Sequence, residues 1–392
     1  MMILFEEAYE TVMQYARPLG TEQAGLTDLL NRVIAEDVIS DMDMPPFDKS
    51  AMDGYACRRE DLGNVLTVVE EIPAGRIPEK KISRNQCAEI MTGAMVPEGA
   101  DCVIIVEQTE QAGVDTIRFT GEKTENNICY RGEDIRKAEV VLKKGTKMKP
   151  QHVAIMASMG VVHPAVYRRP LVGIISTGDE LVEPDQSPAH SQIRNSNAYQ
   201  LIAQVWSAGA IPGYEGIAAD TTESTREKIE KALDKNDIIL LTGGVSMGQY
   251  DLVPDIMTGL GIEQKFQRIA VQPGKPTIFG VKGEKLCFGL PGNPVSSFLL
   301  FELLVKPLLL GLMGHHHAPI NLILPMAAEY KRKKSSRESW FPVRINPDGE
   351  VEPLDYHGSA HLYSLDEAAG MVSIPIGETT LRKGEKVGVR LV

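Results

Sequence analysis

Two glycine-containing segments carry the residues best suited to chemistry. One is LLTGGVSMGQYD, residues 240–251, and the other is FGLPGNPVSSF, residues 288–298. In each, an apolar strand-like run breaks at glycine and a helix-like run begins soon afterwards, which is typical of strand-loop-helix units that hold anions. We therefore predict that both loops bind a phosphorylated ligand.

The first loop offers backbone donors and a hydroxyl group. Gly243 and Gly244 carry no Cβ, so the backbone can take positive φ there and bring its N–H groups close to a ligand oxygen. Ser246 adds the hydroxyl. For this loop and the next, the structural alternative is a tight turn that binds nothing. The presence of two such loops in one chain favours a binding site.

The second loop contains Pro291, Gly292 and Asn293. Asn293 is suited to cap the following helix, and Pro294 is suited to its first position, where a missing N–H costs nothing. The helix N-terminus then presents a partial positive charge to a bound anion.

The elements that must position these loops alternate regularly. We expect strands over 171–176, 211–217 and 238–242, and helices over 197–208 and 223–233. Such alternation predicts a parallel sheet covered by helices, with ligands at the carboxyl ends of the strands. Thr177, Asp220 and Gly243 lie at those ends.

The rest of the chain has a different texture. We expect helices over 5–17 and 150–159, an apolar core helix over 298–312, and short strands over 33–39, 64–70, 102–108, 321–325, 340–345 and 386–392. The pattern predicts a discontinuous N-terminal domain (1–44 and 141–168), an inserted β-rich domain (45–140), an α/β domain (169–318) and a C-terminal β domain (319–392).

Composition excludes several classes of protein. A formal charge of -12 argues against a general nucleic-acid or membrane-surface binder, and 43% hydrophobic residues are enough for several packed cores. The five cysteines are scattered without the paired spacing of a zinc site or disulfide framework, which indicates a reducing cytoplasm. We expect no signal peptide and no membrane span, because the most apolar helix contains Glu302 and Lys306.

Eight ordered motifs cover nearly the whole chain. They are PPFDKSAMDGYA (45–56), IMTGAMVPEGAD (90–101), RGEDI (131–135), STGDEL (176–181), TGGVSMGQYD (242–251), QPGKP (272–276), GLPGNPVS (289–296) and HGSAH (357–361). With these motifs the sequence resembles the MoeA family of molybdopterin molybdenumtransferases, which includes the E domain of gephyrin.

The resemblance implies a fold and an activity. The implied fold is multidomain α/β and β: a three-layer α/β molybdopterin-binding domain, the discontinuous and inserted domains, and a C-terminal β-barrel-like domain, assembled as an elongated homodimer. The implied enzyme takes adenylylated molybdopterin and molybdate as substrates, inserts the metal with Mg²⁺ present, and releases AMP. A molybdopterin adenylyltransferase and molybdoenzymes are further partners that the resemblance suggests.

The resemblance also implies a set of acidic catalytic residues. Mg²⁺ prefers one or two carboxylates together with phosphate oxygens and water, which suits Glu180, Asp220 and Asp251 beside a phosphate loop. Asp53, Thr92 and Asp134 match positions that the family contributes from the partner subunit, and the Thr92 hydroxyl is expected to orient a carboxylate or water. The alternatives are structural: Asp251 as a helix cap, Asp220 or Asp53 in a turn, and Thr92 in the turn before Gly93.

Molybdate is a tetrahedral dianion that needs hydrogen-bond donors. By resemblance these donors are Ser246, Lys275, Arg337 and Ser359. The chain departs from the family at Gln272, where lysine is usual, and at Cys129 and Tyr130 before Arg131. These departures leave the choice between molybdate and tungstate open.

Two basic runs near the C-terminal domain have simpler interpretations. Residues 331–334 are expected to be a solvated edge strand with protective lysines. His315–His317 are expected to be a solvated loop, since three consecutive histidines cannot face one metal from a regular element.

Three alternative functions remain beside the molybdenum insertase. One is a non-catalytic scaffold like gephyrin, against which the retained acidic residues argue. The second is a related transferase or adenylyltransferase acting on molybdopterin, and the third is a tungstate-selective insertase.

Overall fold

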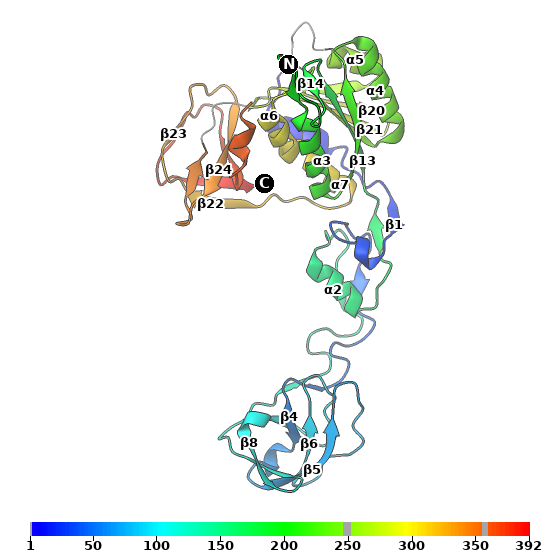
Figure 1. Ribbon diagram of the computed structural model, residues 1–392, viewed down its shortest axis with the longest axis vertical. Coiled ribbons are helices and arrows are strands. Elements are labelled where there is room, and N and C mark those ends of the chain that lie inside the picture. The colour runs from blue at the N-terminus through cyan, green and yellow to red at the C-terminus, as the bar shows by residue number, and fades with distance from the viewer. Residues whose placement is uncertain (1, 246–251, 355–359) are drawn as a thin grey trace. The chain divides into compact units, whose positions relative to one another are not determined.

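A computed structural model describes residues 2–245, 252–354 and 360–392. The chain divides into two compact units (Figure 1). The larger unit contains Met1–Glu36, Gly145–Val153 and His163–Val392, and the smaller unit contains Asp37–Lys144 and Ala154–Val162. The division into four domains is finer than this and stays a prediction. Three predicted site residues, Ser246, Asp251 and Ser359, lie outside the described residues.

A six-stranded sheet of order β16-β13-β17-β21-β20-β18 lies at the centre of the larger unit (Figure 1). The strands are β13 (Leu171–Thr177), β16 (Ile211–Ala218), β17 (Ile238–Thr242), β18 (Glu263–Arg268), β20 (Pro276–Lys282) and β21 (Lys285–Leu290). The first four in the sheet order are parallel, as predicted. β20, for which the sequence made no prediction, is antiparallel to both of its neighbours, so the sheet is mixed. The reason is the short turn between β20 and β21, which can join only antiparallel strands.

Helices cover both faces of this sheet and make three layers. One face packs against α1 (Phe5–Met13), α3 (Ser196–Ala208), α6 (Pro294–Leu300) and α7 (Lys306–Leu312), and the other packs against α4 (Thr222–Lys235) and α5 (Val253–Gly259). Successive strand residues enter opposite cores: Leu240 packs in the first and Leu241 in the second, both fully buried. The strands are therefore apolar throughout, which is why their positions could be predicted from sequence.

The helix after the second glycine loop is one long run. A π-helical segment, Phe301–Val305, joins α6 to α7. In the described part of the chain, Pro294–Leu312 is the single helix that meets the length and hydropathy of a membrane span, and 89% of that window is buried inside the protein. The helix is part of the core, as expected for 298–312.

A second six-stranded sheet forms the C-terminal part of the larger unit (Figure 1). Its order is β19-β24-β26-β28-β22, with β25 paired to β24. Its strands are β19 (Val271–Gln272), β22 (Asn321–Pro325), β24 (Glu338–Ile345), β25 (Val351–Pro353), β26 (Gly370–Ile374) and β28 (Lys386–Leu391), while β23 (Tyr330–Lys331) pairs with β27 (Thr380–Leu381). The first residue of the QPGKP motif, Gln272, is the last residue of β19, so the motif begins beside the start of β24.

Short elements complete the larger unit. β1 (Thr21–Gln23) pairs with β12 (Ala165–Tyr167), and β14 (Leu181–Val182) pairs with β15 (Ile193–Arg194). The strand expected over 33–39 is confirmed only at its end, where β2 (Val38–Ile39) forms, since Val33 and Ile34 make isolated bridges, to Lys147 and Val166. Backbone hydrogen bonds to two different neighbouring segments break the pairing of this run.

The smaller unit is built on a sheet of order β7-β4-β6-β5-β9-β8. The strands of this sheet are β4 (Gly54–Cys57), β5 (Val65–Ile72), β6 (Gln86–Ile90), β7 (Cys102–Ile105), β8 (Thr109–Gly113) and β9 (Thr116–Phe119). Outside it, β2 (Val38–Ile39) pairs with β11 (Val140–Leu142), and β3 (Lys49–Ser50) pairs with β10 (Ile128–Cys129). The division between the two units falls within α2 (Pro150–Ser158), after Val153. The strand expected over 102–108 stops at Ile105, where a 3₁₀ turn begins.

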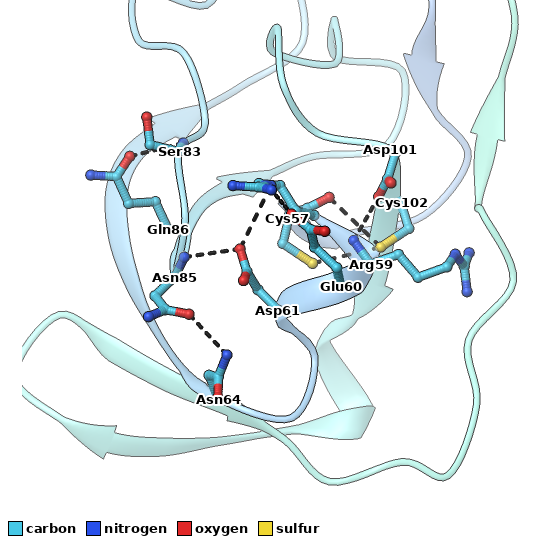
Figure 2. A network of polar contacts seen from close by, with 11 residues as sticks. Cys57, Arg59, Glu60, Asp61, Asn64, Ser83, Asn85, Gln86, Asp101 and Cys102 are labelled. Atoms are coloured by element: carbon cyan, nitrogen blue, oxygen red, sulfur yellow. Dashed lines mark hydrogen bonds and ion pairs between the residues drawn. The ribbon is translucent and has the colours of Figure 1, made fainter.

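A polar network lies at one end of this sheet (Figure 2). The Asp61 carboxylate accepts the Asn85 N–H at 2.9 Å, and the Asp101 carboxylate accepts the Arg59 N–H at 2.6 Å. The Cys57 and Cys102 sulfurs are 3.7 Å apart and remain thiols, as do the other three cysteines. No predicted site residue belongs to this network, so we assign it to the stability of the unit.

Candidate functional site

The carboxyl ends of β17 and β21 bring the two glycine loops together. The Gly243 N–H donates to the Leu290 carbonyl at 3.1 Å. A Cβ placed on Gly292 would lie 3.5 Å from the Gly243 Cα. The loops therefore lie side by side, because the strands that precede them are neighbours in the sheet.

Both glycines of the first loop have the predicted positive φ. The angle is 93° at Gly243 and 63° at Gly244. A Cβ on Gly243 would lie 2.6 Å from the Thr177 carbonyl oxygen and 2.8 Å from its hydroxyl, and a Cβ on Gly244 would lie 2.9 Å from the same hydroxyl. Glycine is thus required here by conformation and by space.

Thr177 lies beneath this glycine pair at the end of β13. Its side chain is buried, with only 5% of the residue exposed. Among the described residues its Oγ1 has no hydrogen-bond partner. The sequence placed Thr177 at the strand end but gave it no role, since only packing shows that its hydroxyl is buried and unpaired.

Asn197 ties both loops to α3, and sequence reasoning missed it. Its Nδ2 donates to the Gly292 carbonyl at 2.7 Å and to the Thr242 Oγ1 at 2.9 Å. The Thr242 hydroxyl in turn donates to the Pro291 carbonyl at 3.3 Å. One signal was available: the run Asn195-Ser196-Asn197 opens a helix, and Asn195 caps it through the Ala198 N–H at 3.3 Å.

Asn293 and Pro294 begin α6 at the predicted positions. Asn293 is the N-cap residue and Pro294 opens the helix. The expected side-chain cap is wrong, since the Asn293 side chain makes no capping hydrogen bond. Its backbone carbonyl accepts the Ser297 N–H at 3.0 Å, which is the first hydrogen bond of the helix.

Two of the predicted metal ligands lie at neighbouring strand ends. The Asp220 carboxylate accepts the Asp179 N–H at 3.3 Å, and the Asp179 carboxylate accepts the Asp220 N–H at 3.1 Å. The Glu180 carboxylate folds over Gly178, where a Cβ would lie 2.3 Å from its Oε2. No group of three His, Cys, Asp or Glu side chains suited to a metal occurs within the described residues, and Asp251, the third predicted ligand, lies outside them.

Gln272 and Arg337 meet at the edge of the C-terminal sheet. The Arg337 Nη2 donates to the Gln272 Oε1 at 3.4 Å, and its Nη1 donates to the Val271 carbonyl at 3.1 Å. Burial lowers the pKa of Arg337 from its ordinary value, which lies far above neutrality. Lys275 is exposed three residues after Gln272. The structure therefore places a guanidinium group directly beside the residue that departs from the family.

In the smaller unit, Thr92 is hydrogen-bonded to the Asp53 carboxylate. Both the Thr92 N–H, at 2.6 Å, and its hydroxyl, at 2.8 Å, donate to the Asp53 Oδ1. These two hydrogen bonds, the backbone one first, lower the pKa of Asp53. Asp134 lies elsewhere, on a cavity of about 690 Å³ that Lys49, Cys129 and Glu133 also line. The structure thus pairs Asp53 with Thr92 but does not place Asp134 in contact with them.

The basic runs differ in part from expectation. Lys331, Lys333 and Lys334 are exposed, as predicted, but the expected edge strand over 331–334 is wrong beyond Lys331, where β23 ends. His315–His317 form a loop in which His316 is exposed, as expected, whereas His315 and His317 are half-buried. The His315 Nδ1 lies 2.8 Å from the Gly145 carbonyl, and burial, with Arg390 as the next cause, lowers the pKa of His317 to about 4.

The fold and the site together define a class of protein. It is a multidomain α/β protein whose glycine loops and acidic residues meet at the carboxyl edge of a three-layer domain, with β-rich parts before and after it. Three family models match along the chain: the MoeA N-terminal region (domain I and II) at residues 3–160, a probable molybdopterin binding domain at 173–311, and the MoeA C-terminal region (domain IV) at 325–392. The chain belongs to the MoeA family.

Individual relatives agree with this assignment. The molybdopterin molybdenumtransferase of Bacillus subtilis strain 168 is 33% identical over 99% of this chain and 93% of its own length. A protein of the same name from Staphylococcus epidermidis is 32% identical over 99% of this chain and 95% of its own length. The crystal structure of the molybdopterin biosynthesis MoeA protein from Pyrococcus horikoshii OT3 superposes with a TM-score of 0.83 at 30% identity, covering 100% of both chains.

Proposed function

We propose that this protein acts in molybdenum cofactor biosynthesis as a molybdopterin molybdenumtransferase, which inserts molybdate into adenylylated molybdopterin and releases AMP. The observation that carries the proposal is the pair of glycine loops beside two strand-end carboxylates, in a chain that belongs to the MoeA family along its whole length. We also infer that the protein works in the cytoplasm, which suits its five free thiols.

The glycine loops bind the phosphorylated part of the substrate in this proposal. The Gly243 N–H already donates to the Leu290 carbonyl, so the Gly244 N–H is the donor that we propose for the ligand, and Ser246 follows in the same loop. Pro291, Gly292 and Asn293 bring the N-terminus of the long helix against the first loop. Asn197 keeps the two loops in register because it bonds to both of them.

The acidic residues fit a magnesium ion. Asp220 and Glu180 present oxygen ligands at adjacent strand ends, and the ion ordinarily completes its shell with water and phosphate oxygens. We propose Glu180, Asp220 and Asp251 as its ligands. When bound, the ion neutralises negative charge on the substrate phosphates. The Asp179 carboxylate supports this arrangement by fixing the backbone at Asp220.

Molybdate is the second substrate and requires hydrogen-bond donors. We propose that Lys275 and Arg337 supply positive charge, that Gln272 supplies an amide donor, and that Ser246 and Ser359 supply hydroxyls. The contact between Arg337 and Gln272 supports this grouping, because it orients the Gln272 amide by occupying its oxygen.

We further propose that the active form is a homodimer. In this proposal Asp53, Thr92 and Asp134 serve the site of the partner subunit, as the family resemblance implies, and the chain keeps the four-domain division expected from its sequence. A molybdopterin adenylyltransferase and molybdoenzymes are the proposed further partners.

AMP release tests the proposal. The purified full chain is incubated with adenylylated molybdopterin and molybdate, with and without Mg²⁺, and AMP is followed by chromatography. We expect release that requires Mg²⁺ and that falls at least 10-fold in Asp220→Asn, which keeps side-chain shape but removes a charge available to the ion. Folded protein that releases no AMP under these conditions would exclude the proposed activity.

A further inference from the structure

We propose that a cluster of basic side chains in the larger unit binds a doubly charged oxyanion, at a site separate from the glycine loops. The basic cluster consists of five half-buried residues: Lys147, Lys306, His315, His317 and Arg390. Lys306 lies several turns along the long helix from Asn293, which at about 1.5 Å per residue is roughly 20 Å from the helix N-terminus beside those loops. The inference goes beyond the proposed function and does not depend on it.

Segments far apart in the sequence bring these residues together. The His315 Nδ1 lies 2.8 Å from the Gly145 carbonyl, so the loop of both histidines packs against the segment that carries Lys147. The same loop leads into β22, whose Asn321 pairs with Arg390 in β28. The cluster therefore lies where the α/β part of the unit passes into the C-terminal sheet.

Glu302 is the acidic residue that contacts the basic cluster directly in the described part of the chain. Its Oε2 accepts a hydrogen bond from the Lys306 Nζ at 2.6 Å, and its Oε1 accepts one from the Gln204 Nε2 at 3.0 Å. Both carboxylate oxygens are thus engaged. Glu302 neutralises one of the positive charges and leaves the others.

Two cations of the cluster donate to neutral acceptors instead. The Arg390 Nη2 donates to the Glu302 carbonyl at 2.9 Å, and the Lys147 Nζ donates to the Ser207 carbonyl at 3.4 Å. Charges that are partly removed from water are ordinarily paired with opposite charges. In a chain of formal charge -12, this local excess of positive charge therefore calls for a counterion.

His317 records the excess of positive charge. Burial, followed by repulsion from the four other members of the cluster, lowers its pKa to about 4. The pKa of Lys147 is lowered as well, by burial first and then by Lys306. The further titratable groups that act on these residues are Glu302, Tyr9 and the exposed Lys149. A bound anion would relieve the repulsion among these groups.

The donors indicate the chemistry of the anion. Ammonium and guanidinium groups donate hydrogen bonds and accept none, and their bonds to anionic oxygens are among the strong ones. At neutral pH His317 is uncharged, and Lys147 and Arg390 are the cations that contact carbonyl groups alone. A dianion with several acceptor oxygens, such as sulfate, matches these two charges.

The His317 imidazole provides a local readout of binding. The full chain with labelled histidine is titrated by NMR in chloride and in saturating sulfate at equal ionic strength, and His317→Gln identifies the resonance. We expect the pKa of His317 to rise by about one unit or more in sulfate, because a bound dianion favours the protonated ring. One unit corresponds to about 10-fold tighter binding of sulfate by the protonated form.

A pair of substitutions tests the cluster at neutral pH. Lys147→Gln removes one of the two charges that contact only carbonyl groups, so the sulfate concentration that half-saturates the His317 shift should rise about 10-fold, the usual loss for a hydrogen bond to a charged group. Lys282→Gln is the matched control. It removes the same charge from an exposed side chain at the end of β20 and should leave half-saturation unchanged.

A second arm replaces sulfate with methyl phosphate. A response to sulfate alone assigns the site to free oxyanions, and a response to both extends it to phosphate monoesters. Perchlorate, a tetrahedral anion with a single charge, controls for screening.

Three results would overturn the inference: no response of His317 to sulfate, an equal response to perchlorate at the same ionic strength, or wild-type half-saturation in folded Lys147→Gln. None of them bears on AMP release, so the proposed function is tested separately.

Discussion

At the scale of single residues, hydrogen bonds set the properties of the site's charged groups. Asp53 is fully exposed, yet its pKa is lowered because Thr92 donates two hydrogen bonds to one carboxylate oxygen. A lowered pKa in the folded state adds stability above the ordinary pKa of aspartate, and this stability is lost as the pH falls through the folded pKa.

Thr92→Val should raise the pKa of Asp53 part of the way back to its ordinary value. The change is partial because the backbone N–H, the larger cause, remains. Carboxyl NMR titration from about pH 2 to about pH 6 measures it. An unchanged Asp53 midpoint in the folded variant would show that the hydroxyl does not contact the carboxylate in solution.

Gln272 allows a second test at this scale. Gln272→Lys adds a positive charge beside Arg337 and removes the oxygen that Arg337 contacts. We expect tighter binding of molybdate and tungstate, because a charge at about 4 Å is worth roughly 1 kcal/mol in water and about 4 kcal/mol at an effective dielectric near 20. The gain should shrink at high salt as screening grows. Calorimetry with both oxyanions at two salt concentrations decides, and unchanged affinities would place Gln272 outside the oxyanion site.

At the scale of elements, the first turn of α3 holds the two glycine loops. Asn197→Ala leaves the Gly292 carbonyl and the Thr242 hydroxyl without this donor, so unfolding should become easier by about 1–3 kcal/mol. AMP affinity should fall as well. Urea unfolding and calorimetry measure the two effects, with Ser196→Ala as the exposed control in the same turn. Equal stability and affinity in Asn197→Ala and Ser196→Ala would refute the positioning role.

Sequence predicted the elements whose pattern is local. β17 matches its prediction residue for residue, because strands buried on both faces are continuously apolar. The run 33–39 contains Glu36 and Asp37, and it divides its backbone bonds between two distant segments, which no local pattern records. The antiparallel pairing of β20 with β21 follows from the short turn between Lys282 and Lys285, a local signal that the sequence interpretation did not use.

The candidate site divides in the same way. Glycine at 243 and 244 was predictable because the need for positive φ is local. Asn197 was not, since its position depends on contacts with loops 45 to 95 residues away. For Thr92, the sequence predicted that its hydroxyl orients a carboxylate or water, but it did not identify Asp53 as that carboxylate.

At the scale of the whole molecule, the proposed homodimer makes a test by mixing possible. Asp53→Ala and Asp220→Ala should each be inactive as homodimers, because each lacks one part of every site. A verified heterodimer of the two carries one intact site and should recover about half of the wild-type rate for AMP release. Mass spectrometry establishes the heterodimer. A heterodimer as inactive as its parents would count against sites shared between subunits.

The central claim is that one event releases AMP and places the metal on the pterin. The most direct measurement is a single turnover with adenylylated molybdopterin, Mg²⁺ and molybdate, in which AMP is quantified by chromatography and pterin-bound molybdenum by elemental mass spectrometry. We predict equal amounts of both products at every time point, and neither product in Asp220→Asn. AMP released without metal on the pterin would contradict the claim, because it would show a hydrolase in place of a molybdenum insertase.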